Sequence, residues 1–349
     1  APSDRGRAVG AWSGLSGIAA AIGPFVGGWL IGAGSWRLIF LINVPLAVAV
    51  VAVTLRHVPE SRDPAAGHAI DVAGAALTAI GLAGVTWALI EAGERGANAL
   101  TLSVGAVGLA SLIGFVALER RVREPMLPLD IFYSKQFTAA NLVTFVVYAS
   151  LGVMFFLLVV HLQQVLGYSP LQAGVATLPV TALMLILSAR AGSLADRIGP
   201  RLPMTFGPLI IAVGLALLSR ATTGSTYLGS VLPGILIFGL GLSLTVAPLT
   251  ATVLAAAPAR HAGIASGVNN AIARGAGLLA VAAIPGLTNL TGDAYRDPAV
   301  FASGFRSAML LSAVLAASGG VIAWSLIRNE IAGRVGACPA AKPGRRHYW

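Results

Sequence analysis

Three polar residues lie close together in an apolar stretch of the C-terminal third of the sequence: Asn269, Asn270 and Arg274. In a helix, Asn270 and Arg274 lie four residues apart and share one face. A charged side chain inside a membrane-spanning helix is energetically costly and usually faces the protein interior, where it can contact a polar ligand. If the helix begins at Gly263, Arg274 lies about 17 Å along it, near mid-membrane. If the helix begins later, Arg274 is only an interfacial anchor. We predict these three residues as candidate substrate or gating residues.

A second polar group lies between two apolar stretches, in the segment from Gly192 to Arg201, which contains Asp196, Arg197 and Gly199. Glycines permit a sharp turn. Asp196 can accept hydrogen bonds from the amides of a helix N-terminus or pair with an arginine. The segment is therefore either a functional loop or a turn that only fixes the topology of the chain.

A third polar segment runs from His161 to Gly174 and contains Gln163 and Gln164. These amides can face a polar substrate path, although amides are also common at membrane interfaces. Four nearby aromatic residues either line a cavity for apolar compounds or face lipid and packed neighbours: Phe145, Tyr148, Phe155 and Phe156.

Small residues form a stripe near the start of the sequence, at spacings of three and four: Gly10, Gly14, Gly17, Ala21, Pro24 and Gly28. Such spacing places them on one face of a helix, where another backbone can approach closely. Pro24, within Gly23-Pro24-x-x-Gly27-Gly28, breaks the helix locally because it donates no hydrogen bond. Tight packing alone is the alternative explanation.

The elements that position these residues are predicted to be membrane-spanning helices. Hydrophobic residues make up 56% of the 349 residues and charged residues only 10%, whereas a soluble domain carries roughly 25% charged residues. Roughly ten stretches reach the length of about 20 apolar residues that a span needs. The predicted fold class is therefore an all-α polytopic membrane protein. The stretches are Val9–Ile31, Trp36–Thr54, Val72–Ile90, Leu100–Leu118, Ala139–Val160, Leu171–Ala189, Pro203–Ser219, Tyr227–Ala247, Ile264–Leu287 and Gly304–Ile327.

The distribution of basic residues predicts the orientation of the chain. Of the 23 Lys and Arg residues, most lie in the segments on the side of the two termini. Those on the opposite side are Arg37, Arg95, Arg220, Arg296 and Arg306, and Arg274 lies inside a stretch. Because basic loops stay in the cytosol, we predict a multi-pass protein of the inner or plasma membrane with both ends of this chain cytosolic. The net charge of +10 is scattered in this way and indicates no nucleic-acid partner.

Several kinds of chemistry have no support in the sequence. Cys338 is the only cysteine and the five histidines are scattered, so we predict no metal site. The sequence has no glycine-rich phosphate loop and no motif of a hydrolytic enzyme. We therefore predict no catalytic residues, no cofactor and no enzyme activity, and any transport must use an ion gradient.

Two of the motifs resemble a known family. Gly23-Pro24-x-x-Gly27-Gly28, after a stripe that includes Gly14 and Gly17, resembles the antiporter motif of the major facilitator superfamily. Trp36-Arg37-x-x-Phe40-x-x-Asn43-x-Pro45 is similar to the start of the next span in its fourteen-helix drug:proton antiporters. Arg37 and Asn43 of this segment are further candidate substrate or gating residues, as are Gln163 and Gln164. Gly192-x-Leu194-Ala195-Asp196-Arg197-x-Gly199-x-Arg201 resembles the cytoplasmic loop motif of the superfamily, which helps latch one transporter conformation.

The resemblance implies a partial major facilitator fold and the role of a drug or antibiotic exporter. Residues 1–55 would end the N-terminal bundle, 56–136 would form two linking helices with cytosolic loops, 137–328 a six-helix C-terminal bundle and 329–349 a cytosolic tail. The chain would be a fragment that lacks about four spans, with the proton-coupling acids among them. The partners implied are small amphiphilic substrates, protons and the lipid bilayer. A non-transporting remnant or membrane sensor is the alternative, and the sequence leaves the oligomeric state open.

Overall fold

The computed structural model describes residues 23, 26–32, 34–57, 71–122, 125–258 and 261–329. Within these ranges all regular secondary structure is helical, as expected of a chain that must satisfy its backbone hydrogen bonds inside lipid. Nine segments of the described residues are long and apolar enough to cross a membrane, which confirms the predicted all-α polytopic fold. The remaining predicted stretch, Val9–Ile31, lies largely outside the described residues. The nine segments are α2 (Leu38–Leu41) with α3 (Asn43–His57), α4 (Val72–Arg95), α5 (Ala99–Glu119), α6 (Lys135–Gln164), α7 (Pro170–Ala176) with α8 (Leu178–Ile198), α9 (Arg201–Leu218), η2 (Tyr227–Val231) with α10 (Leu232–Ala255), α11 (Ala262–Leu287) and α12 (Pro298–Leu326).

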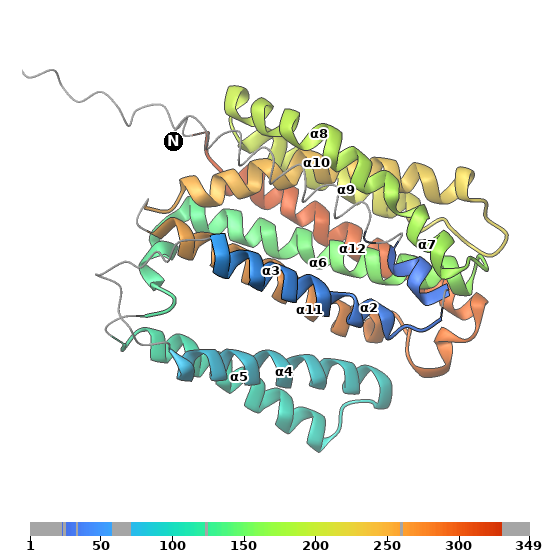
Figure 1. The fold of residues 1–349 in the computed structure, drawn as a ribbon, viewed down its shortest axis with the longest axis horizontal. Coiled ribbons are helices and arrows are strands. Elements are labelled where there is room, and N and C mark those ends of the chain that lie inside the picture. The colour runs from blue at the N-terminus through green and yellow to red at the C-terminus, as the bar shows by residue number, and fades with distance from the viewer. Residues whose placement is uncertain are drawn as a thin grey trace, which may run out of the picture.

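The helices from α6 onward pack side by side as a bundle (Figure 1). Helix α6 packs against α11 and α12, α9 packs between α10 and α12, and α8 covers α10. Large side chains fill the space between them, and Phe137, Phe238, Phe301 and Phe305 are fully buried. Because these side chains come from α6, α10 and α12, they hold three helices of the bundle together.

Helices α4 and α5 form a hairpin beside the bundle, attached through α11 (Figure 1). Gly84 and Gly108 let the two helices of the hairpin touch, since a Cβ on Gly84 would lie 3.0 Å from the Gly108 Cα. Gly93 of α4 and Gly286 of α11 are equally close, and a Cβ on either would lie within about 3 Å of the other Cα. Glycines therefore allow the close contact between α4 and α5 and the close contact between α4 and α11.

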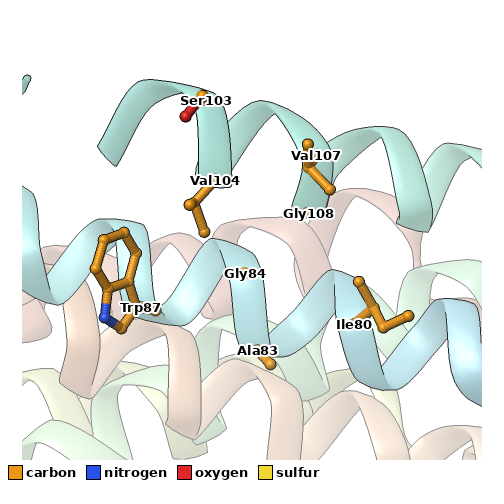
Figure 2. A pocket seen from close by; sticks show the side chains of 8 residues that line it. All are labelled: Ile80, Ala83, Gly84, Trp87, Ser103, Val104, Val107 and Gly108. Carbon is orange, nitrogen blue, oxygen red and sulfur yellow. The ribbon is translucent and has the colours of Figure 1, made fainter. Parts of the chain in front are cut away.

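An apolar cavity of about 450 Å³ lies at the crossing of α4 and α5 (Figure 2). Its lining consists of Ile80, Ala83, Gly84, Trp87, Ser103, Val104, Val107 and Gly108. Ser103, the one hydroxyl of this lining, donates its hydrogen bond to the Leu100 carbonyl of its own helix. The cavity therefore offers a ligand apolar contact and little polar recognition.

The predicted end of the stretch Leu171–Ala189 is wrong, because α8 continues to Ile198. The glycine at position 192, expected to permit a turn, lies within this helix, and Asp196 and Arg197 belong to its last turn. The turn comes at Gly199, whose φ of 86° is disfavoured for residues with a Cβ, and Pro200 follows. Polar residues had suggested a loop, but they form the water-facing end of a long helix.

Candidate functional site

A cavity of about 650 Å³ lies between α6, α10 and α11. Most of its lining comes from α11, with an aromatic wall from α6 and a single residue from α10. Arg274 carries the only charge among the described residues that line it. The lining residues are Tyr148, Leu151, Gly152, Phe155, Thr250, Ser266, Asn269, Asn270, Ala273, Arg274, Gly277, Leu278 and Val281.

The three polar residues predicted on α11 all line this cavity. Ser266, Asn270 and Arg274 recur every four residues, so they form one polar face of the helix. Because α11 begins at Ala262, Arg274 lies roughly 18 Å from its start at 1.5 Å per residue. This position is near the middle of a helix of 26 residues. The guanidinium group also acts electrostatically on the Tyr148 hydroxyl across the cavity.

Asn269 is held by two side chains of α6. Its Nδ2 donates to Thr144 Oγ1 at 2.7 Å and to Asn141 Oδ1 at 3.2 Å. The Thr144 hydroxyl donates to the Ala140 carbonyl, and the Asn141 amide donates to the Phe137 carbonyl. The Thr144 Oγ1 and Asn141 Oδ1 atoms can therefore only accept from Asn269, which fixes the orientation of the Asn269 amide. Both amide hydrogens of Asn269 are therefore engaged, and its Oδ1 is the atom that it can offer to a ligand.

The wall opposite α11 is formed by Tyr148, Phe155 and the small residue Gly152. Phe155 packs edge-to-face on Phe238 with ring centroids 6.2 Å apart, which fixes the orientation of its ring. A Cβ on Gly152 would lie 2.9 Å from the Gly277 Cα, so α6 and α11 touch through glycine at the floor of the cavity. Sequence reasoning missed Gly152 and Gly277, because single glycines in apolar stretches are common.

The chain also matches the family described as Major Facilitator Superfamily over residues 1–282. The chain belongs to this superfamily. The match and the nine apolar helices among the described residues together indicate a multi-pass protein of the cell membrane, and the predicted major facilitator fold is confirmed.

Three relatives within the superfamily carry names that refer to resistance. Multidrug resistance protein Stp of Mycobacterium tuberculosis is 34% identical over 77% of this chain and 50% of its own length. The tetracenomycin C resistance and export protein of Streptomyces glaucescens is 31% identical over 85% of this chain and 55% of its own length. The puromycin resistance protein pur8 of Streptomyces alboniger is 30% identical over 96% of this chain and 69% of its own length. The chain thus spans about half the length of the first two relatives.

The segment that resembles the cytoplasmic loop motif contacts the end of α12 at the start of α9. Arg201 donates from Nε to the Trp324 carbonyl at 2.9 Å, and its backbone N–H donates to Asn329 Oδ1 at 3.0 Å. Gly199 packs on the same asparagine, and a Cβ at this position would lie 2.4 Å from the Asn329 Cγ. Asp196 and Arg197 are exposed, and no ion pair among the described residues includes Asp196. The predicted pairing of Asp196 is therefore not seen in this part of the chain.

The segment that resembles the antiporter motif lies only partly within the described residues. Gly14, Gly17 and Pro24 lie outside the described residues, whereas Gly23 and Gly27 have open space where a Cβ would stand. Gly28 is buried, and a Cβ there would lie 2.7 Å from the Leu171 Cα at the start of α7. The predicted close approach of a second backbone therefore occurs at Gly28.

The remaining candidate residues lie away from the cavity. Arg37 stacks on Trp36, with its Cζ 4.9 Å from the ring centroid. Asn43 donates to the Ile39 carbonyl at 2.9 Å and so joins α2 to α3. Gln163 donates to the Val159 carbonyl of its own helix at 3.3 Å, and Gln164 is exposed at the end of α6. Their proposed contact with substrate stays a prediction.

Proposed function

We propose that the complete protein exports small amphiphilic molecules, such as drugs or antibiotics, in exchange for protons by alternating access. The observation that carries this proposal is the cavity between α6, α10 and α11, where Asn269, Asn270 and Arg274 face the aromatic wall. A cavity of about 650 Å³ falls within the volume range typical of small-molecule sites. The names of the relatives support the same class of substrate.

The lining favours a particular substrate chemistry. Tyr148 and Phe155 offer aromatic surface, while Asn270 and Ser266 offer hydrogen bonds to polar groups. The positive charge of Arg274 attracts an anionic or electron-rich oxygen and repels a cation. Flat aromatic compounds with carbonyl, phenolate or carboxylate oxygens fit this lining better than cationic amphiphiles.

Transport by alternating access requires two bundles that rock around a shared site. We assign residues 137–328 to the C-terminal bundle, 56–136 to the linking helices, 1–55 to the end of the N-terminal bundle and 329–349 to a tail. The distribution of basic residues supports two cytosolic ends. Among the described spans, acids lie only near helix ends, so we expect the coupling acids elsewhere in the complete protein.

The test is an efflux assay with the complete product of the gene in proteoliposomes. We expect an imposed pH gradient to drive export of an aromatic anionic antibiotic, and Arg274→Gln to raise its KM at least several-fold. Arg274→Lys keeps the charge but loses the planar guanidinium, so it should give an intermediate KM. Flux that does not respond to the pH gradient would contradict proton antiport. Substrate binding without any flux would favour the alternative that the protein is a membrane sensor. The absence of both binding and flux would favour the alternative that it is a non-transporting remnant.

A further inference from the structure

The carboxyl groups of Asp71 and Glu119 face each other where the two ends of the α4–α5 hairpin meet. Asp71 caps α4, and its Oδ1 accepts a hydrogen bond from the Gly74 N–H at 2.8 Å. Glu119 ends α5, and its Oε2 accepts from the Leu127 N–H at 3.0 Å. One oxygen of each carboxyl group lies beside Gly74, and Glu119 is only 3% exposed. One oxygen of each carboxyl group is thus satisfied by a backbone donor.

The second oxygen of each group has no such donor. Asp71 Oδ2 and Glu119 Oε1 are buried and have no hydrogen-bond partner among the described residues. Both lie over Gly74: a Cβ there would overlap Asp71 Oδ2 and lie 3.2 Å from Glu119 Oε1. Ionised carboxylates only accept hydrogen bonds, and each buried acceptor without a donor costs about 1–3 kcal/mol. A single proton on either oxygen turns this contact into one O–H···O hydrogen bond that satisfies both.

We propose that Asp71 and Glu119 form a proton-binding site in which the two facing carboxyl groups share one proton. No basic residue among the described neighbours of the pair neutralises the carboxyl groups in place of this proton. The charged residues described on the surrounding elements are exposed and form no ion pair with either carboxyl group. These residues are Arg120, Arg121, Asp130 and Lys135. On α11, which packs against α4, the one charged residue is Arg274, which faces the transport cavity. A Ca²⁺ or Mg²⁺ ion would need at least six oxygen ligands, whereas a proton needs only the two facing oxygens.

The site connects three segments of the chain. It joins the start of α4 to the end of α5, and through Leu127 it holds the segment that leads into η1 (Leu129–Tyr133) and the bundle. When the proton leaves, two like charges face each other in a buried position, which is unfavourable. The structure therefore assigns to the hairpin a proton-dependent clamp whose action does not require the proposed export function.

Infrared spectroscopy of the complete gene product in detergent tests whether the proton is present. In spectra recorded from acid to alkaline pH, we expect a C=O stretching band of a protonated carboxyl group that is lost in both Glu119→Gln and Asp71→Asn. Asp130→Asn is the matched control, because the Asp130 side chain is exposed to solvent, and this variant should leave the band unchanged. A wild-type spectrum without a band that responds to Glu119→Gln overturns the proposal.

Thermal unfolding across a pH series tests the clamp independently. Because the folded site binds its proton more tightly than the unfolded chain does, the stability that it provides is present at low pH and is lost as pH rises. We expect the Tm of the wild type to fall toward alkaline pH more than that of Glu119→Gln, whose amide donates permanently to Asp71. Equal pH dependence, or failure of this isosteric variant to fold at neutral pH, contradicts the shared proton. A Tm that rises with Na⁺ only when Glu119 is present would assign the site to a metal cation instead.

Discussion

The guanidinium group of Arg201 stacks on the indole ring of Trp324, with its Cζ 4.4 Å from the ring centroid. The same side chain donates from Nε to the Trp324 carbonyl, so one residue at the start of α9 is bound twice to the end of α12. A cation–π contact contributes about 0.5–2 kcal/mol depending on its exposure, and a hydrogen bond from a charged donor about 1.5–3 kcal/mol. Arg201 is therefore the principal link between these two helix ends.

Arg201→Gln should reduce the Tm of the complete protein and change its conformational equilibrium, because it removes both contacts with Trp324. Because the two contacts together contribute about 2–5 kcal/mol, the loss is expected to be at least about 2 kcal/mol. Differential accessibility of a cysteine introduced at the C-terminal end of α12 would report the change in conformation. Arg197→Gln, four residues earlier and exposed in the last turn of α8, is the control and should leave both readouts unchanged. Equal effects of the two variants would show that only the charge of this segment matters.

The contact between Gly152 and Gly277 predicts an unequal response to alanine at the two positions. Gly152→Ala would place its Cβ 2.9 Å from the Gly277 Cα, so α6 and α11 must separate. Gly277→Ala would meet its nearest atom, the Tyr148 carbonyl oxygen, at 3.7 Å, which is an ordinary contact. We expect Gly152→Ala to cost about 1–3 kcal/mol of unfolding free energy and to reduce the cavity, while Gly277→Ala stays near the wild-type value. Equal Tm values for the two variants would contradict this packing.

The membrane fold could be predicted from the sequence because apolar length and charge position determine it directly. Nine segments among the described residues lie where apolar stretches were expected, and the largest error was the end of α8. There the segment around Asp196 looked like a loop because it is polar, whereas a polar helix end that extends into water has the same composition. Hydropathy distinguishes segments of the chain that lie in lipid from segments that lie in water. It does not distinguish a helix from a loop where the chain lies outside the membrane.

The candidate site could be predicted only in part. Asn269, Asn270 and Arg274 were identifiable because polar residues inside a span are costly without a function. Tyr148 and Phe155 of the aromatic wall were named as possible cavity-lining residues, with contacts to lipid or packed neighbours as the alternative. Gly152 was not identifiable, since its importance depends on which helix packs against α6. The pair of Asp71 and Glu119 was also not predictable, because the two residues belong to different helices and lie 48 positions apart in the sequence.

Two glycines with positive φ allow backbone strain to be separated from packing. Gly199 and Gly224 have φ values of 86° and 83°, but a Cβ at Gly224 would meet open space while one at Gly199 would overlap the Asn329 side chain. Gly224→Ala should therefore cost only the strain of a left-handed residue, about 1–2 kcal/mol. Gly199→Ala should cost more and should also weaken the link between α9 and the end of α12. Unfolding of both variants in detergent gives the comparison, and a smaller loss for Gly199→Ala would contradict the contact with Asn329.

Asn269 and Asn270 are neighbours in sequence but should respond differently to substitution. Asn269 donates to Thr144 and Asn141 of α6, so Asn269→Ala removes interhelical hydrogen bonds that are each worth about 0.6 kcal/mol and at most about 1.7 kcal/mol in membrane proteins. Asn270 is exposed to the cavity, so Asn270→Ala should change the KM for substrate and leave the Tm unchanged. A double-mutant cycle of Asn269→Ala with Thr144→Val isolates the contact between α6 and α11. A coupling free energy of zero, or a Tm loss in Asn270→Ala as large as that in Asn269→Ala, would show that the two side chains do not divide structural and binding roles in this way.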